Sequence, residues 1–287
     1  MANELYKIED LQQLSPALQT RGGLALLRTV EKITSLDKLN RLYMKSMDTG
    51  KRGPDLAEEL CHNYGISYEV GGLDLDKLPQ GPFITISNHP YGGADGLALI
   101  DLFGHIRPDL KVMVNKILGM AKGVSQNMIT VTPTGEVRTA ASPESVQGIK
   151  MSIEQIRSGG VLGLFPSGAV SDFKLKEWKV RDREWQLPVI KLIRKLNVPV
   201  VPVRFFDRNS NFYYSLGLIN WKVRLLRLPR EVMNKAGKQM RIGIGEVIDP
   251  AVFKEYGTLE ELRDFLRSTV YDMPLPKTFT PRSELNL

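Results

Sequence analysis

Short runs of β-branched and apolar residues alternate along most of the chain with stretches in which apolar residues recur every three or four positions. The first pattern is typical of strands and the second of amphipathic helices. The predicted strands are residues 66–70, 83–86, 111–114, 129–131, 161–165, 198–201 and 240–244. This alternation predicts the α/β class, with a mixed, largely parallel sheet flanked by helices.

The first 65 residues lack such runs and predict a helical N-terminal segment, with helices over 8–48 and about 55–64. The α/β domain is expected over residues 66–273. Three prolines after residue 273 predict an irregular C-terminal tail, 274–287.

Two helices of the α/β domain have clear start signals. Ser142 and Pro143 predict the start of one, and Thr258 with Glu261 has the spacing of a capping box for the other. The inner face of the first would consist of Val146, Ile149, Ile153 and Ile156. The second would bury Leu262, Phe265 and Leu266.

Composition narrows the possible classes of protein. With 287 residues, 42% of them hydrophobic and 25% charged, the chain has a globular balance, which excludes general disorder. No run approaches the ~18 apolar residues that cross a bilayer, and the first residues lack the apolar stretch of a secretory signal. The net charge of +7 suits an anionic partner such as phospholipid, an acidic carrier or nucleic acid. The single cysteine, Cys61, excludes an intrachain disulfide and favours a reducing compartment.

One of the three histidines lies in a segment suited to chemistry. His89 belongs to Ser87-Asn-His-Pro-Tyr-Gly-Gly-Ala-Asp95-Gly, between the predicted strand 83–86 and a predicted helix over 97–103. Ligands of α/β folds bind where a strand ends in such a turn. Asp95 can accept a proton from one imidazole nitrogen of His89, which leaves the other nitrogen free as a base. The residues equally allow Asp95 to cap the helix and His89 to fill the turn.

A second predicted strand ends in Leu164-Phe-Pro-Ser-Gly-Ala-Val-Ser171. Ser167 resembles a nucleophile, but Phe165 occupies the position where the nucleophile elbow requires glycine. A serine hydrolase that uses Ser167 and His89 therefore has weak support and stays an alternative. Backbone N–H groups around Gly168 could hold an anionic group or a developing oxyanion.

Other motifs are missing from the sequence. There is no P-loop, and Gly243-Ile-Gly245 lacks the third glycine of a dinucleotide fingerprint. No second histidine sits at ligand spacing from His89, so we predict no metal site. We expect His62 and His105 to be structural or surface residues. A basic module that binds nucleic acid or membranes stays a further alternative, although no RNA-binding aromatic signature or Cys/His finger occurs.

Three ordered blocks carry a family resemblance: Asn88-His89 with Asp95, then Phe165-Pro166-Ser-Gly168, then Val198-Pro199-Val-Val-Pro202-Val203. Over about residues 80–205 they resemble the blocks of the glycerolipid (lysophospholipid-type) acyltransferases. The resemblance implies that His89 deprotonates an acceptor hydroxyl and that Asp95 orients this histidine. Gly168 matches the glycine of the family's third block, and Pro202 the proline of its fourth.

The resemblance also implies substrates and a cellular location. The donor would be acyl-CoA or acyl-carrier-protein and the acceptor a lysolipid, in membrane lipid biosynthesis, with no bound cofactor and no nucleic acid. The chain would contact the cytoplasmic face of the inner membrane peripherally. The expected substrate-binding residues are Asn88, Gly92, Gly93, Pro166, Ser167 and Gly168, with Lys116, Arg138 and Lys174 as basic candidates for an anionic donor. Lys176 and Lys179 are further candidates of the same kind.

The sequence departs from the family pattern at positions that bear on the acceptor. Five residues rather than four separate His89 from Asp95, and Gly92-Gly93 can absorb the extra residue because glycine adopts unusual backbone angles. Ser167 and Val170 occupy the positions of the Glu and Arg that the family associates with a glycerol-phosphate acceptor. We therefore predict a different acceptor. The form Pro-Tyr-Gly-Gly-x-Asp-Gly resembles bacterial enzymes that O-acylate lyso-amino-acid lipids, such as lyso-ornithine or lyso-glycine lipids.

Residues 216–230 combine apolar and basic side chains, which favours a membrane-docking element. The residues expected to meet the lipid are Trp221, Leu225 and Leu226 together with Arg224 and Arg227. Packing of this segment on the core explains the same pattern, and residues 24–44 are a competing membrane face.

Overall fold

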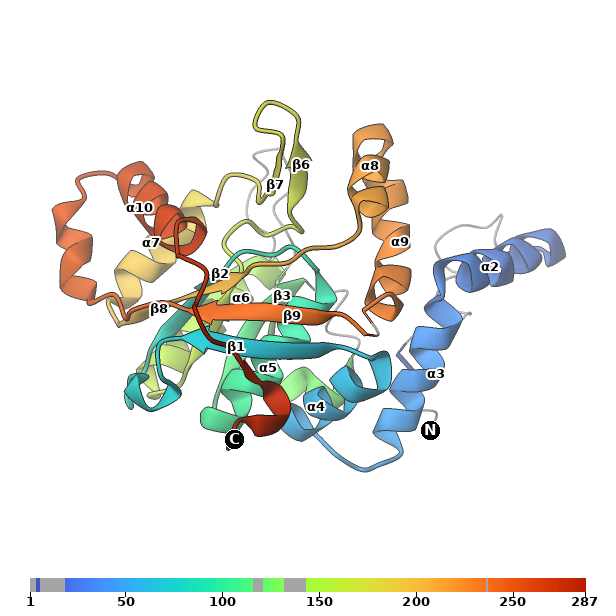
Figure 1. The fold of residues 1–287 in the computed structure, drawn as a ribbon, viewed down its shortest axis with the longest axis horizontal. Coiled ribbons are helices and arrows are strands. Elements are labelled where there is room, and N and C mark those ends of the chain that lie inside the picture. The colour runs from blue at the N-terminus through green and yellow to red at the C-terminus, as the bar shows by residue number, and fades with distance from the viewer. Residues whose placement is uncertain (1–3, 6–18, 116–120, 132–142, 236) are drawn as a thin grey trace.

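An eight-stranded sheet forms the centre of the protein, which we describe from a computed structural model (Figure 1). The structure describes residues 4–5, 19–115, 121–131, 143–235 and 237–287, and within them the strand order is β10-β1-β9-β8-β2-β5-β3-β4. The strands are β1 (Ser67–Gly72), β2 (Ile84–Ser87), β3 (Lys111–Asn115), β4 (Met128–Val131), β5 (Leu162–Leu164), β8 (Val200–Phe205), β9 (Gln239–Ile244) and β10 (Thr280–Pro281). A separate antiparallel hairpin consists of β6 (Asp172–Lys174) and β7 (Lys179–Arg181).

Five neighbouring strands, β8, β2, β5, β3 and β4, run parallel to one another. Within this block Ile84 of β2 lies between Val200 of β8 and Leu162 of β5. The strands β1 and β9 are parallel to each other, and β9 pairs antiparallel with β8. The predicted mixed, largely parallel sheet is confirmed. The carboxyl ends of β2, β5 and β8 therefore meet at one edge of the sheet.

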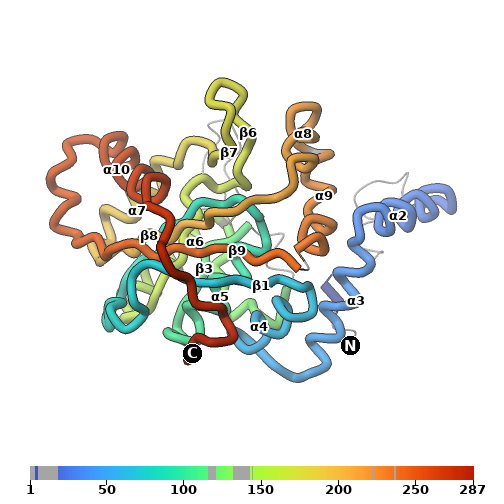
Figure 2. The backbone as a smooth tube through the Cα atoms, viewed as in Figure 1, coloured from blue at the N-terminus to red at the C-terminus, as the bar shows by residue number. Residues whose placement is uncertain are grey.

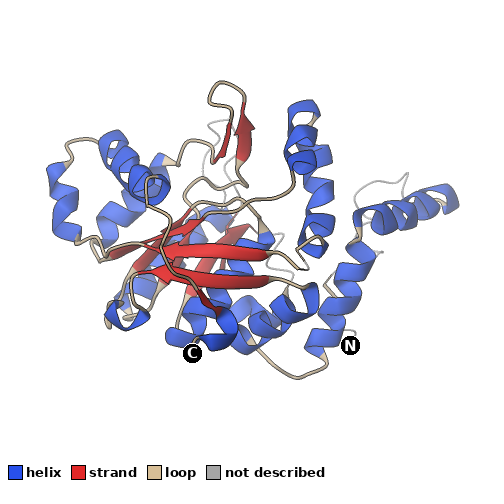
Figure 3. Cartoon of the chain, in the orientation of Figure 1, coloured by secondary structure: helices blue, strands red, loops and turns tan. Residues whose placement is uncertain are grey.

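Helices cover both faces of this sheet (Figure 3). Side chains alternate between the faces, so that Phe83 and Val112 pack in one core with α4 and α5, whereas Ile84 and Leu162 pack in the other with α6, α7 and α10. These helices are α4 (Gly53–Tyr64), α5 (Gly93–Ile106), α6 (Pro143–Arg157), α7 (Leu187–Leu196) and α10 (Leu259–Tyr271). Short 3-10 helices are η2 (Leu75–Lys77), η4 (Lys122–Asn127), η5 (Pro250–Glu255) and η6 (Arg282–Glu284). The predicted capping box of α10 is confirmed, since Thr258 and Glu261 exchange hydrogen bonds.

Four further helices gather beside one end of the sheet (Figures 1 and 2). They are α2 (Arg21–Thr34), α3 (Leu36–Met47), α8 (Asn211–Ile219) and α9 (Trp221–Met233). Both α2 and α3 contact α9, and Arg230 donates a hydrogen bond to the carbonyl of Ile33. The backbone N–H and the hydroxyl of Ser210 donate to the carboxylate of Glu231, which ties the start of α8 to α9. None of the helices in the described ranges combines the length and the apolar character needed to cross a membrane.

The predicted inner face of α6 is wrong in part. Val146 and Ile149 are exposed, and the buried face carries Ser145, Gly148, Ser152, Gln155 and Ile156. A Cβ atom at Gly148 would collide with Cγ1 of Val131, so the helix approaches β4 too closely for a larger side chain. This close approach turns small and polar residues toward the sheet. Ser142, the predicted cap, lies outside the described residues.

The C-terminal tail is less irregular than its prolines predict. Thr280 and Pro281 form β10, which pairs antiparallel with Val70 and Glu69 of β1. The guanidinium of Arg282 then binds the buried carboxylate of Asp101 on α5, with Nη2 2.9 Å from Oδ1. Long-range pairing of this kind leaves no local pattern, and it fastens the tail to the sheet.

Candidate active site

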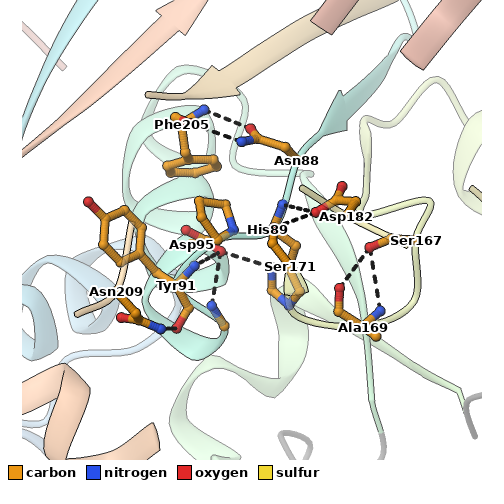
Figure 4. A network of polar contacts seen from close by, with 12 residues as sticks. Asn88, His89, Tyr91, Asp95, Ser167, Ala169, Ser171, Asp182, Phe205 and Asn209 are labelled. Atoms are coloured by element: carbon orange, nitrogen blue, oxygen red, sulfur yellow. Dashed lines mark hydrogen bonds and ion pairs between the residues drawn. The ribbon is translucent and has the colours of Figure 1, made fainter. Parts of the chain in front are cut away.

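The side chains of His89 and Asp95 meet at the carboxyl end of β2 (Figure 4). Nδ1 of His89 lies 2.9 Å from Oδ2 of Asp95, as the sequence predicts for a base and its orienting group. The His89 side chain is 14% exposed and that of Asp95 is fully buried. No described residue forms a hydrogen bond or ion pair with Nε2 of His89, so this nitrogen is available to accept a proton from a bound molecule.

Asp95 both orients His89 and organises the turn before α5. The N–H groups of Tyr91 and Gly92 donate to its Oδ2 at 2.9 and 3.0 Å. Burial raises the pKa of the Asp95 carboxyl, while the His89 contact and these two donors oppose the shift. Gly92 has φ of +80° and packs against Val170 and Leu228, which explains how the longer His–Asp spacing is accommodated. The Asp95 side chain therefore caps the start of α5 and contacts His89 at the same time.

Residues 88–92, which we call the β2 loop, are held by groups far away in the chain. The amide of Asn88 accepts from the N–H of Phe205 and donates to its carbonyl, which extends the pairing of β2 with β8. Both polar atoms of the Asn88 side chain are thereby engaged, so this residue positions the loop. The ring of His89 lies against that of Phe165, with centroids 4.1 Å apart.

Asp182 is a buried carboxylate behind the β2 loop that the sequence analysis missed. Its Oδ1 accepts hydrogen bonds from the backbone N–H of His89 and the hydroxyl of Ser171, and its Oδ2 accepts one from the indole of Trp185. Burial raises its pKa, opposed by these donors. Asp182 thus fixes the backbone that carries the proposed base.

In the loop after β5, residues 165–171 (the β5 loop), the hydroxyl of Ser167 and the N–H of Gly168 bond within the loop, and other polar groups bond to residues outside it. The hydroxyl of Ser167 is buried and donates to the carbonyl of Ala169 at 2.8 Å (Figure 4). The N–H of Gly168 donates to the carbonyl of Phe165 at 3.0 Å, and the carbonyl of Pro166 accepts from the N–H of Gln186. The suggested oxyanion donor at Gly168 is therefore occupied, and Ser167 lacks the histidine contact that a nucleophile requires.

The predicted basic residues have different positions. Lys116 and Arg138 lie outside the described residues. Lys174 is on β6 and lies 4.0 Å from Asp172, at the limit of an ion pair. Arg224, which we expected to face lipid, is buried, with Nη1 2.5 Å from Oδ1 of Asp172 and 3.0 Å from the carbonyl of Ser171. Arg227 lies 3.3 Å from Glu231, so this predicted lipid-facing pair serves internal contacts instead.

The family of the chain follows from comparison with known proteins. A family model described as an acyltransferase matches residues 22–275. The chain belongs to this acyltransferase family. The match spans both the helices that precede the sheet and the loops that carry His89 and Ser167, so the predicted acyltransferase activity is confirmed.

Similar proteins give this membership more detail. The acyltransferase is 28% identical over 252 residues to a lyso-glycine lipid O-acyltransferase of Bacteroides thetaiotaomicron, covering 85% of this chain and 88% of the relative. It is 27% identical over 252 residues to a protein of the same name from Phocaeicola vulgatus, covering 85% and 86%. A solved structure, the 1-acyl-sn-glycerophosphate acyltransferase PlsC of Thermotoga maritima, aligns with a TM-score of 0.46 and 17% identity, covering 89% of this chain and 88% of that one.

Proposed function

We propose that this acyltransferase moves a fatty acyl group from an acyl thioester to the hydroxyl of a lysolipid, with His89 as general base. The observation that carries the proposal is the pairing of Nδ1 of His89 with the buried Asp95, which leaves Nε2 without a partner among the described residues. A thioester is already activated, so a positioned base and a shaped site can provide much of the acceleration.

The proposed reaction is a direct transfer. Nε2 of His89 takes the hydroxyl proton while the acceptor oxygen bonds to the thioester carbonyl carbon. Asp95 stabilises the resulting imidazolium charge, and the tetrahedral intermediate collapses as the carbon–sulfur bond breaks. The proton on His89 then passes to the departing thiolate, which restores the neutral base. Ser167 takes no part, in keeping with its buried hydroxyl and its bond to Ala169.

For the acceptor we propose a lyso-amino-acid lipid of the lyso-glycine type. The names of the two bacterial relatives support this class. The β5 loop supports it as well, because Val170 packs in an apolar cluster with Tyr213 and Tyr214 and presents no guanidinium to a phosphate.

For the cellular location we propose peripheral contact with the cytoplasmic face of the inner membrane through α2, α8 and α9. These helices share exposed large apolar side chains: Leu26, Ile33, Phe212, Leu218, Ile219, Trp221, Val223, Leu225 and Leu226. Exposed basic residues on α2, namely Arg21, Arg28 and Lys32, take the role first given to Arg224 and Arg227. Since Tyr214 of α8 donates to the carbonyl of Pro90, this surface adjoins the β2 loop.

Two sets of substitutions test this docking surface. Replacing Ile219, Trp221 and Leu226 with Ser should lower flotation with anionic vesicles, and Arg28→Glu with Lys32→Glu should remove its salt dependence. The matched control is Met151→Ser with Leu275→Ser, which removes exposed apolar side chains elsewhere. If every variant floats with the vesicles as well as the wild type does, docking belongs to another surface.

The activity itself is tested with purified protein and mass spectrometry of the lipid products. Labelled acyl-CoA and acyl-carrier-protein are each offered with lyso-glycine lipid, lyso-ornithine lipid and lysophosphatidate. We expect an O-acylated lyso-amino-acid lipid from at least one donor. Efficient acylation of lysophosphatidate, with the lyso-amino-acid lipids inert, would overturn the proposed acceptor class. Absence of any acylated product with both donors would count against the proposed lysolipid reaction.

A further inference from the structure

A cavity of about 510 Å³ opens beside the β2 loop, between the β6–β7 hairpin, the end of β8 and the end of α10. Asn88 and Pro90, the two neighbours of His89, line this cavity, whereas His89 itself does not. The cavity therefore adjoins the backbone of the loop that carries the proposed base. In Figure 1 the hairpin stands between α10 and α8, over the edge of the sheet where this loop lies.

Positive charge dominates the lining of the cavity. The basic residues that line it are Lys179, Arg181, Arg204 and Arg208. The acidic ones are Asp207 and Asp272, and Asp207 is already bound by Arg241, with Nη2 2.6 Å from Oδ1 and Nε 3.1 Å from Oδ2. Among the described residues no carboxylate forms an ion pair with Lys179, Arg204 or Arg208. The cavity therefore has cationic groups that a bound anion could neutralise.

Two of the guanidinium groups are held in place before any ligand binds. Arg204 donates to the carbonyl of Met273 at 2.7 Å and lies 4.7 Å from the centroid of the Phe206 ring. Arg181 lies 5.0 Å from the centroid of the Tyr271 ring, and its Nε is already paired with Oε2 of Glu177 at 3.5 Å. A fixed guanidinium loses little rotamer freedom on binding, and its fork of donors matches the oxygens of a carboxylate or a phosphate. Burial lowers the pKa of Arg204, a sign of desolvation that a nearby anion would offset.

We propose that this cavity is a subsite for the anionic oxygens, carboxylate or phosphate, of a substrate of the transfer reaction. The inference rests on the proposed function, because both substrates carry such a group. A lyso-amino-acid lipid has a carboxylate, and the pantetheine arm of a thioester donor has a phosphate. Of the described basic residues expected to meet the donor, Lys179 alone lies in this lining. Arg181, Arg204 and Arg208 are additions from the structure.

Calorimetric titration with two matched pairs of probes tests the subsite. The first pair is pantetheine 4′-phosphate and pantetheine, and the second is N-octanoylglycine and its uncharged amide. We expect the charged member of at least one pair to bind more tightly than its neutral partner. Lys179→Gln combined with Arg208→Gln should lower the affinity for the charged member at least fivefold and leave the affinity for the neutral member unchanged. Both substituted side chains are exposed, so the fold should persist.

Two further variants separate local recognition from general charge. Lys195→Gln with Lys254→Gln removes two exposed positive charges elsewhere and should leave affinity unchanged. Arg204→Lys keeps the charge but removes the forked donors of the guanidinium. It should lower the affinity for the charged probe by a smaller factor than the Lys179/Arg208 double variant does. Equal binding of charged and neutral probes, or an equal loss in the Lys195/Lys254 control, would overturn the subsite.

The two arms identify the source of the anion. If the Lys179/Arg208 variant loses affinity for the phosphate probe alone, the subsite belongs to the donor. If it loses affinity for the carboxylate probe alone, the subsite belongs to the acceptor. Binding needs no turnover, so a wild-type protein that binds the probes but transfers no acyl group would contradict the proposed function and leave the subsite standing.

Discussion

The β2 loop and the β5 loop leave neighbouring parallel strands at the same edge of the sheet, yet their polar groups are used differently. In the β2 loop, Asp95 and Asp182 hold the ring and the backbone of His89, and Nε2 of the ring stays free of described partners. In the β5 loop, the hydroxyl of Ser167 and the N–H of Gly168 bond within the loop itself. The first arrangement suits proton transfer, and the second suits a rigid wall. Resemblance in sequence to two family blocks therefore does not give both loops the same kind of role.

The largest effect on this contrast should come from Asp95→Asn. The amide can still accept from Tyr91 and Gly92, but it cannot stabilise an imidazolium, so we expect acyl transfer to fall by roughly 10²–10⁴-fold. Burial raises the pKa of Asp95, so its contribution to folding is fully present at acid pH and is lost as pH rises through the raised value. At neutral pH the free energy of unfolding of the variant should therefore equal or exceed that of the wild type.

Steady-state kinetics and urea unfolding of the same Asp95→Asn preparation check both parts. Turnover within a few-fold of the wild type would remove Asp95 from the mechanism. A marked loss of stability would instead make its turn-forming role the dominant one.

A smaller effect on activity is expected from Asp182→Ala, which tests the support of the β2 loop from behind. The substitution leaves the N–H of His89 and the donors of Ser171 and Trp185 without their acceptor. We expect the free energy of unfolding to fall by about 3 kcal/mol, since each buried unpaired group costs about 1–3 kcal/mol. Turnover should fall with it, and Asp264→Ala, at an exposed ion pair, is the control. Unchanged stability in a urea titration would show that Asp182 does not organise this loop.

The smallest effect concerns the outer side of the same loop. Lys235 donates to Asn209 at 2.7 Å and lies 4.4 Å from the centroid of the Tyr91 ring, and burial lowers its pKa to about 8. Because the folded-state pKa is depressed, the buried charge weighs against folding below pH 8, and this cost fades as pH rises toward the unfolded value. Relative to Lys235→Met, the wild type should gain about 2 kcal/mol of stability between pH 7 and pH 9.5. Urea unfolding of both proteins at the two pH values measures the gain, and a constant difference would mean that Lys235 is not titrating there.

The strands and the His89–Asp95 pair could be predicted because their signals are local. β-branched runs mark the strands, and the pair lies within one glycine-rich turn. Asp182 escaped prediction because it is 93 positions from His89 and sits in a stretch without strand periodicity. The charged hairpin β6–β7 was not predicted either, because its residues also lack strand periodicity.

Arg224 shows where composition misleads. A basic residue among leucines on α9 is typical of a membrane face, but its guanidinium turns inward to Asp172 and lies 5.3 Å from the centroid of the Tyr213 ring. The partner on β6 is 52 positions earlier in the chain, so no helical pattern reveals it. The neighbouring Trp221 and Leu226 are exposed, and their contact with lipid stays a prediction.

The central claim is that the β2 loop supplies the reacting base and the β5 loop does not, and one paired rate measurement tests it most directly. Acyl transfer to lyso-glycine lipid is measured for His89→Ala and Ser167→Ala beside the wild type, with circular dichroism to confirm folding. We expect His89→Ala to lose roughly 10²–10⁴-fold in turnover and Ser167→Ala to stay within a few-fold of the wild type. Near-normal turnover of a folded His89→Ala protein, or loss of activity in a folded Ser167→Ala protein to the level of His89→Ala, would contradict the account.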